Sequence, residues 1–152
     1  MTWERTFAML KPDAVQRGLV GEILGRLERK GFRIAALRLI QVTPEQAARH
    51  YAVHEGKPFY NRLVAYIQSS PVVALVLEAP DAVSQLRLLV GATKPSEAAP
   101  GTIRGDLGID ISNNLIHASD SAENAACEIE VYFSAEEQLG YHRAADHWLV
   151  EE

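Results

Sequence analysis

Six regular segments in the order strand, helix, strand, strand, helix, strand constrain the fold of this chain more than any other feature. Short apolar runs bounded by turn residues predict the strands, whereas apolar residues spaced three and four apart predict the helices. This order is typical of an α+β, ferredoxin-like split βαβ sandwich, in which helices pack on one face of a four-stranded antiparallel sheet. The predicted segments cover residues 7–10, 20–31, 32–42, 71–77, 80–91 and 115–117.

Between the second and third strands, the sequence predicts two additional helices. Residues 43–46 combine a capping threonine, a proline at the first helical position and a glutamine that completes a capping box. This short helix runs through Tyr51. A second helix follows residues 57–58 and carries Phe59 and Leu63 on one face.

Residues 92–113 show neither a helical nor a strand period and are rich in proline and glycine. A loop of this length inside a compact domain is usually functional or disordered. After the last strand, residues 120–123 begin a final helix, and a tail covers about 134–152. No repeat or linker divides the sequence, so we expect a single domain over residues 1–152.

Composition excludes several classes of protein. Of the 152 residues, 47% are hydrophobic and 23% are charged, which is typical of a folded globular domain. No apolar run approaches the roughly 20 residues needed to cross a bilayer, and the first residues lack the apolar core of a secretory signal. A single cysteine, Cys127, fits a reducing compartment, so we expect a cytoplasmic protein. The net charge of −5 argues against general affinity for nucleic acid or anionic membranes.

His117 is the candidate nucleophile. It ends the last predicted strand, with Asn114 three residues before it, Ser119 two residues after it and a helix start beyond. The free N–H groups and dipole of a helix start favour phosphate, and a neutral imidazole can attack phosphorus without a separate base. A lone histidine at a strand end is more often a packed residue, but these neighbours favour the chemical interpretation. The other histidines lack such a setting and are expected at the surface; they are His50, His54, His142 and His147.

Four residues are candidates for binding phosphate, although lysines and arginines in such positions are more often ordinary surface residues. Lys11 ends the first strand, where it could offer a point charge to a transferring phosphoryl group. Arg87 and Arg104 carry guanidinium forks that match phosphate oxygens, and Thr93 offers a hydroxyl. The glycines beside Arg104 would let the backbone approach a ligand closely. The sequence has no glycine-rich phosphate loop and no cluster at metal-ligand spacing, so Mg²⁺ would arrive with the nucleotide phosphates.

Three segments, residues 5–13, 100–106 and 114–120, follow the order and spacing of the motifs of the nucleoside diphosphate kinase family. The chain resembles this family over essentially its whole length. The resemblance implies a phosphotransferase that moves the γ-phosphate of a nucleoside triphosphate to a nucleoside diphosphate. It also implies a ping-pong mechanism through a phosphohistidine at His117. Asn113 departs from the arginine common in the family, without removing a group from the proposed transfer.

The resemblance gives Glu128 and Tyr51 roles beside His117. From position alone, Glu128 could equally be a solvated helix residue; in the family a glutamate here holds the catalytic ring. A carboxylate on the far ring nitrogen would fix the tautomer and raise the nucleophilicity of the other nitrogen. Tyr51 matches a family tyrosine near the histidine, and Ser119 completes the set of polar groups around the phosphates.

The resemblance also implies how the nucleoside is bound. Phe59 and Leu63 would form one wall against the base, with Ile111 on the other side, although their spacing by itself favours core packing. Asn114 matches a family residue near the ribose hydroxyls. Such apolar walls imply little discrimination between bases.

We expect the chain to form a homo-oligomer. The loop 92–113 and the tail 134–152 have few places to pack within one small domain, so both need support from neighbouring subunits. The family forms hexamers and tetramers, and the long tail resembles the hexameric members, which favours a hexamer.

Two other functions remain open from the sequence. A nucleotide sensor without turnover would retain the arginines but would not explain a pair between His117 and Glu128. A nucleic-acid-binding module fits less well, because the chain is acidic and has no basic stripe with interleaved aromatic residues.

Overall fold

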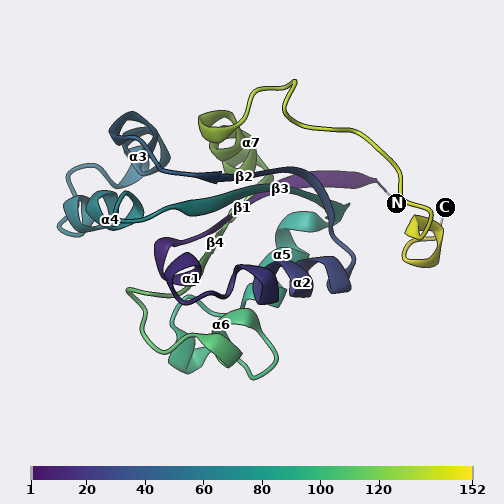
Figure 1. The fold of residues 1–152 in the computed structure, drawn as a ribbon, viewed down its shortest axis with the longest axis horizontal. Helices are drawn as coiled ribbons and strands as arrows, with labels where there is room; N and C mark the ends of the chain where they lie inside the picture. The colour runs from purple at the N-terminus through teal and green to yellow at the C-terminus, as the bar shows by residue number, and fades with distance from the viewer. Residues whose placement is uncertain (1, 152) are drawn as a thin grey trace.

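A four-stranded antiparallel sheet in the order β2-β3-β1-β4 forms the centre of the structure, a computed structural model that describes residues 2–151 (Figure 1). The strands are β1 (Trp3–Leu10), β2 (Arg33–Ile40), β3 (Val72–Pro80) and β4 (Ile116–Ala118). Because β3 lies between β1 and β2, and β1 lies between β3 and β4, each helical crossover skips one strand. This is the split βαβ arrangement, and the predicted fold class is confirmed.

The helices are more numerous than the sequence predicts. They are α1 (Pro12–Gln16), α2 (Val20–Lys30), α3 (Pro44–His50), α4 (Tyr60–Ile67), α5 (Ala82–Val90), α6 (Ile103–Leu107) and α7 (Ala122–Tyr132). Short 3₁₀ turns are η1 (Ala52–His54), η2 (Pro95–Glu97) and η3 (Asp146–Trp148). The predicted capping box at the start of α3 is confirmed. Within the described residues, none of these helices is long and apolar enough to cross a membrane.

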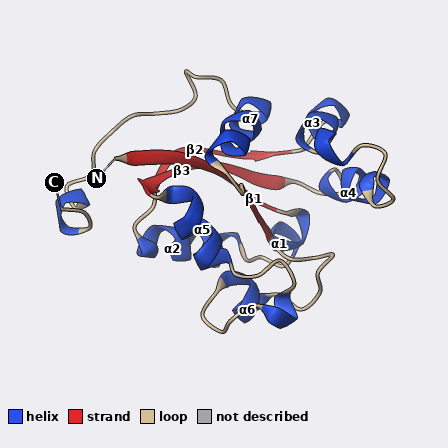
Figure 2. Cartoon of the chain, turned by 180° about the vertical axis from the view of Figure 1, so that it is seen from behind, coloured by secondary structure: helices blue, strands red, loops and turns tan. Residues whose placement is uncertain are grey.

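Helices cover both faces of the sheet, so the expectation of one covered face was wrong (Figure 2). On one face, α2 and α5 pack with α1 and α6 over a core that includes Phe32, Leu75 and Leu77. On the other face, α3, α4 and α7 pack over Phe7 and Val76. Every residue of β3 is buried as a result. The unbroken apolar run of this strand is typical of a strand that is covered on both sides.

The segment 92–113 is a structured excursion that contains η2 and α6, which the sequence analysis missed. The Thr102 side chain caps α6 by accepting a hydrogen bond from Gly105 N at 3.0 Å. A Cβ atom at Gly105 would lie 2.0 Å from the carbonyl oxygen of Ala99. Gly105 is therefore required by this internal packing.

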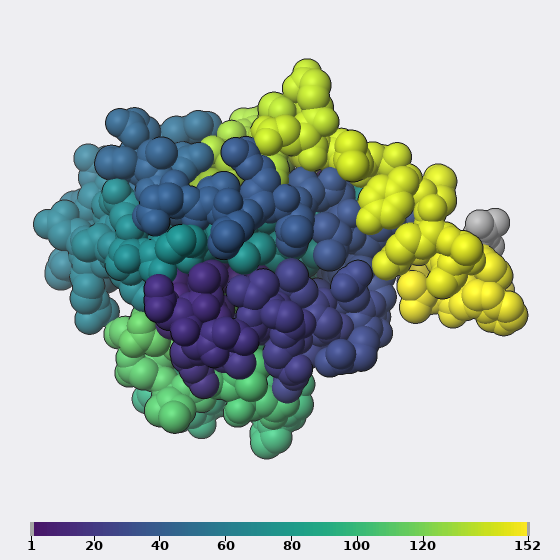
Figure 3. Space-filling view, in the orientation of Figure 1, coloured from purple at the N-terminus to yellow at the C-terminus, as the bar shows by residue number. Residues whose placement is uncertain are grey.

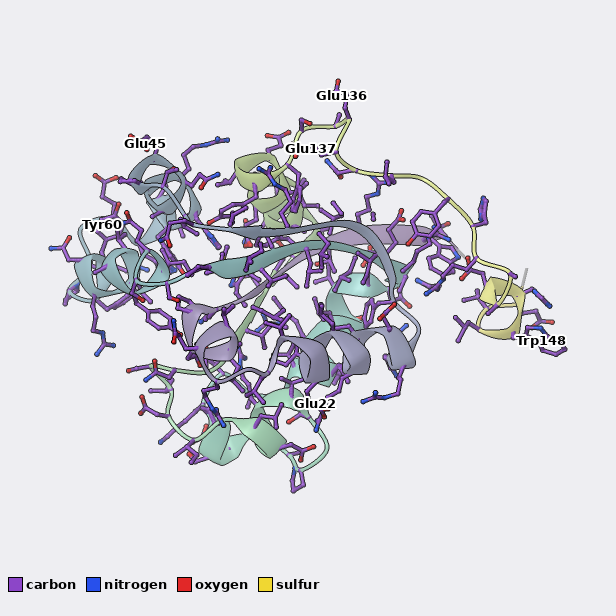
Figure 4. The ribbon with its side chains drawn as sticks, in the orientation of Figure 1. Glu22, Glu45, Tyr60, Glu136, Glu137 and Trp148 are labelled. Atoms are coloured by element: carbon purple, nitrogen blue, oxygen red, sulfur yellow. The ribbon has the colours of Figure 1, made fainter. Side chains whose placement is uncertain are left out.

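The C-terminal tail leaves α7 and runs along the edge strand β2 (Figure 3). Leu139 N donates to Ala35 O at 2.8 Å, and the Tyr141 hydroxyl donates to Ile34 O at 2.6 Å. The tail ends at η3, beside the N-terminal end of β1. Figure 4 shows Trp148 directed away from the body of the molecule, and its side chain is 81% exposed.

Candidate active site

A cavity of about 420 Å³ opens beside β4, between α3 and η1 on one side and α5 and the excursion 92–113 on the other. One side of α7 forms a further wall. Eight of the twelve residues that the sequence analysis singled out line this cavity; they are Lys11, Tyr51, Arg87, Thr93, Arg104, Asn114, His117 and Glu128. Residues more than 100 positions apart in the sequence therefore meet at one place.

His117 and Glu128 form the central contact of the cavity. His117 pairs with Met9 in the sheet, and its ring lies on the face that α7 covers. Its Nε2 lies 2.5 Å from Glu128 Oε2, and the Ser119 hydroxyl donates to the same oxygen at 3.1 Å. No residue within 2–151 forms a hydrogen bond with the ring's Nδ1. The carboxylate thus fixes one ring nitrogen and leaves the other nitrogen without a partner.

His50 is buried behind His117, so the expectation that it lies at the surface was wrong. Its ring stacks on Tyr51 with centroids 4.6 Å apart and meets the His117 ring edge-on at 4.9 Å. Burial, together with the charges of His117 and Lys11, lowers the pKa of His50 well below its ordinary value. Ala47, His50 and Tyr51 are all buried at helical spacing, and this period was the signal available in the sequence.

The same packing creates a three-residue group that linear spacing does not reveal. The possible ligand atoms of His50, His117 and Glu128 all lie within 4.8 Å of one another. Tyr51 closes this corner of the cavity. Burial and the Glu128 charge raise the pKa of Tyr51 to about 12, so its hydroxyl stays neutral near pH 7.

Positive charge gathers at the other end of the cavity. Lys11 Nζ donates to Asn114 Oδ1 at 2.8 Å, and Asn114 Nδ2 donates to Thr93 O at 3.0 Å. Arg87 Nη1 donates to Ala118 O at 3.1 Å. Burial and the Arg104 charge lower the pKa of Lys11 to about 8. Cations this close destabilise one another until an anion enters the cavity.

Arg104 is buried and fixes the chain that leads into β4. Its guanidinium donates to the carbonyl oxygens of Asn114 at 3.1 Å, Gly91 at 3.2 Å and Ile116 at 2.5 Å. Burial and the Arg87 charge lower the pKa of Arg104 to about 10. Arg104 therefore combines a structural role with a positive charge at the cavity wall.

A strained turn precedes His117. Leu115 has φ of 74°, a left-handed conformation that is uncommon for a leucine. Its N–H donates to Asp13 Oδ2 at 3.0 Å, its carbonyl accepts from Lys11 N at 2.8 Å, and Tyr66 donates to Asp13. These contacts hold the turn, and with it the start of β4, in one conformation.

Four of the residues singled out from the sequence do not line the cavity. Ser119 is buried and contacts Glu128 from behind. Leu63 packs against the core that α3, α4 and α7 cover, whereas Phe59 and Ile111 are 39% and 50% exposed.

Several residues that do line the cavity were missed; they are Arg49, Val53, His54, Ala118, Asp120, Asn124, Cys127 and Val131. Asn124, Cys127, Glu128 and Val131 follow helical spacing, so the side of α7, and not only its first turn, faces the cavity. Helical spacing counted from Glu128 was the signal in the sequence that could have identified these residues of α7.

A ferredoxin-like sheet that carries a histidine–carboxylate pair beside a cluster of cations is suited to an enzyme that acts on phosphate groups. The profile of the family described as nucleoside diphosphate kinase matches residues 4–138. The chain belongs to the nucleoside diphosphate kinase family. It is accordingly a phosphotransferase.

Known proteins of this family match this chain over nearly its whole length. A nucleoside diphosphate kinase of Archaeoglobus fulgidus is 54% identical over 149 residues, which are 98% of this chain and 99% of that protein. One from Roseiflexus castenholzii is 53% identical over 148 residues, 97% of this chain and 99% of the relative. The solved nucleoside diphosphate kinase of Halobacterium salinarum, in complex with CDP, has a TM-score of 0.95 and 47% identity. That match covers 99% of this chain and all of the other.

Proposed function

We propose that this enzyme transfers the γ-phosphate of a nucleoside triphosphate to a nucleoside diphosphate through a phosphohistidine at His117. The contact between His117 Nε2 and Glu128 Oε2 at 2.5 Å carries this proposal. With the proton on Nε2, the Nδ1 lone pair is available to attack the γ-phosphorus. The N–P bond forms as the bond to the β-phosphate oxygen breaks, and the diphosphate leaves. A second diphosphate then attacks the same phosphorus with a terminal oxygen and releases the ring.

The cationic end of the cavity binds the phosphates in this proposal. Lys11, Arg87 and Arg104 neutralise charge on the phosphoryl oxygens, with Thr93 and Asn114 between them as polar contacts. Lys11, Asn114 and Thr93 already form a chain of hydrogen bonds, which supports a site whose geometry is set before the ligand arrives. Ser119 acts indirectly, through its hydrogen bond to Glu128.

The base is proposed to bind between Phe59 and Leu63 on one side and Ile111 on the other. Phe59 and Ile111 are large apolar side chains left exposed, which supports a role in covering a flat ligand. The CDP complex of the Halobacterium salinarum relative supports a nucleoside diphosphate as the ligand class.

Mg²⁺ is proposed to enter with the nucleotide phosphates, where it neutralises charge on the transferring group. Apart from Glu128, Asp120 is the carboxylate that lines the cavity within the described residues. The hydrogen bond from Asn124 holds the pKa of Asp120 below its usual value, so the side chain is ionised and fits contact with a water of the hydrated ion. The remaining charged residues at that end are cations, which fits an ion that is held mainly by phosphates.

A homo-oligomer in the cytoplasm, with a hexamer favoured over a tetramer, completes the proposal. Strand β2 is an edge of the sheet, and Leu37 and Leu39 on it are 49% and 68% exposed. Exposed Trp148 on the tail adds a second apolar surface. Edge strands and exposed apolar patches of this kind are typical of subunit interfaces. Light scattering in dilute buffer would measure the assembly; a fully active monomer would overturn this part of the proposal.

Incubation with γ-labelled ATP and Mg²⁺ tests the mechanism. The phosphoenzyme should be labile in acid and stable in alkali, because the phosphate is bonded to a ring nitrogen. His117→Ala should give no labelled protein and no turnover, whereas its nucleotide affinity should stay close to that of the wild type. An acid-stable adduct, or substantial turnover by the variant, would exclude His117 as the nucleophile.

A further inference from the structure

The Nε2 atom of His50 is a buried polar atom that has no hydrogen-bond partner within residues 2–151. Only 2% of the His50 side chain is exposed. Its other nitrogen, Nδ1, contacts the Tyr132 hydroxyl at 2.7 Å, so the ring is fixed in orientation. The unpartnered Nε2 lies 3.9 Å from Glu128 Oε2, beside the pair that the transfer mechanism uses. A buried polar atom without a partner in such a position requires an explanation.

The surroundings of this atom match a metal site in number and type of ligand. Two imidazole nitrogens and one carboxylate oxygen lie within 4.8 Å of one another. Bonds of 2.0–2.1 Å in a tetrahedral zinc site place neighbouring ligand atoms about 3.3 Å apart. The observed separations of 2.5 Å, from His117 Nε2 to Glu128 Oε2, and 3.9 Å, from His50 Nε2 to Glu128 Oε2, lie on either side of that value. The two imidazole nitrogens lie within 4.8 Å of each other, so shifts of about 1 Å would bring all three atoms onto one ion.

We propose that His50, His117 and Glu128 form a binding site for a transition-metal dication, best matched by Zn²⁺, and that occupancy of this site inhibits phosphoryl transfer. The inhibitory part rests on the proposed function of His117, whereas the binding part does not. Two nitrogens and one oxygen suit Zn²⁺, while Mg²⁺ prefers oxygen ligands and octahedral geometry. The site is therefore distinct from the Mg²⁺ that enters with the nucleotide. All three ligands line the cavity, so water or a phosphate oxygen in the cavity could supply a fourth ligand.

The groups around the three ligands complete the site. Metal-binding histidines usually donate their second N–H to a fixed oxygen, and the Tyr132 hydroxyl can accept from Nδ1–H of His50. Burial raises the pKa of Tyr132, so this oxygen remains a neutral hydroxyl. The Ser119 hydroxyl donates to the Glu128 carboxylate. With the His50 ring proton on Nδ1, facing the Tyr132 hydroxyl, the Nε2 lone pair is free for the ion.

Zinc at this site would change the nucleophile directly. The ion binds the Nε2 lone pair of His117, so the ring proton moves from Nε2 to Nδ1 and occupies the lone pair that would attack phosphorus. The cation also takes the Glu128 charge that would otherwise stabilise the phosphorylated ring. Both effects oppose attack by Nδ1.

Calorimetric titration of the nucleotide-free enzyme with ZnCl₂ tests the site. We expect one ion per subunit with micromolar affinity, and little net proton release when the heats are compared in buffers of different ionisation enthalpy, because a neutral histidine keeps its ring proton on the nitrogen that the ion leaves free. His50→Asn should weaken binding at least tenfold. His54→Asn is the matched control, since His54 also lines the cavity but lies outside the three-residue group. Absence of binding below about 100 μM, or equal affinity in wild type and His50→Asn, would overturn the site.

Three further measurements complete the test. Should His50→Asn fold poorly, Glu128→Gln must weaken binding as well, and Co²⁺ added to the wild type must give the intense visible bands of tetrahedral coordination. Activity at buffered free Zn²⁺ with excess Mg–nucleotide should fall with the same midpoint as the calorimetric Kd. Binding without inhibition would overturn the regulatory part. An enzyme without phosphotransfer activity in any condition would refute the proposed function, while calorimetry would still decide the metal site.

Discussion

The two ends of the proposed nucleotide site are built in opposite ways. At the phosphate end, side chains such as Lys11, Asn114 and Arg104 are largely buried and hydrogen-bonded to one another or to backbone carbonyls. At the base end, Phe59 and Ile111 are exposed apolar side chains. Chemistry requires fixed geometry, so the phosphate end is held rigidly, whereas apolar contact without hydrogen bonds discriminates weakly between ligands. The contrast predicts that substitutions at the phosphate end affect rate and that those at the base end affect only affinity.

Glu128→Gln should show the largest effect. The neutral amide retains the size of the side chain but removes the charge that stabilises the phosphorylated ring, so phosphorylation of the enzyme should slow by about 100-fold. Nucleotide affinity should change less than about twofold, because Glu128 lies at the histidine and not among the cations. Rapid-quench measurement of the phosphoenzyme separates these two quantities. Glu130→Gln, an exposed position on the same helix, serves as the control; a lower affinity with an unchanged chemical rate would assign Glu128 to structure.

Arg104→Lys should affect both rate and stability. Lysine retains the charge but cannot reach the three carbonyl oxygens that the guanidinium contacts. A buried carbonyl without its donor costs about 1–3 kcal/mol, so Tm should fall by roughly 4–8 °C, and kcat should fall by roughly tenfold to a hundredfold as β4 shifts. Calorimetry and steady-state kinetics measure the two effects. Arg26→Lys, at an exposed ion pair with Glu22 and Asp106, should change stability by less than about 0.5 kcal/mol.

The pKa of Lys11 gives a pH test of the phosphate end. Because the pKa is lowered to about 8, Lys11 of the free enzyme loses its proton as pH rises through 8, and with it the charge that attracts phosphate. KM should therefore rise by about tenfold between pH 7.5 and 9.5. Over the same window the unfolded chain, with an ordinary lysine pKa, binds more protons than the folded chain, so this group makes stability increase with pH. Nucleotide affinity that falls with pH while stability rises with pH would identify Lys11 as the group that titrates. A KM that does not change with pH would exclude Lys11 as a phosphate-binding charge.

Local sequence signals predicted most of the architecture. The capping box at Thr43 and Gln46, and the helical period of α2, depend on neighbouring residues, and the structure confirms both. The five-residue helix α6 was missed because its glycine and the surrounding prolines are typical of loops. The expectation that helices cover only one face of the sheet was wrong, although the continuous apolar run of β3 already indicated burial on both faces.

The candidate site was harder to predict where it depends on contacts between distant segments. His50 lies beside Glu128 only because α3 and α7 pack on the same face of the sheet, and no local pattern encodes that packing. Arg104 was predicted from its guanidinium group, with the flanking glycines as added support, but Gly105 is required by the Ala99 carbonyl. The identity of a residue indicated the chemistry it could perform, whereas its partners followed from tertiary structure.

Phe59→Ala should give the smallest effect and tests the base end directly. Phe59 is partly exposed and its ring meets His54 at 5.3 Å between centroids, so its loss should leave Tm nearly unchanged. Removing one apolar wall should raise KM by about tenfold for purine and pyrimidine nucleotides alike, since contact of this kind is worth about 1–3 kcal/mol and reads no polar group. The rate of phosphorylation at saturating nucleotide should be unchanged. Steady-state kinetics with four nucleoside diphosphates measures the KM values. Val53→Ala, which changes an exposed apolar residue of the cavity wall, is the control. A KM increase confined to one base would mean that Phe59 orients a polar group that recognises that base. A lower chemical rate would mean that the two ends of the site are not independent.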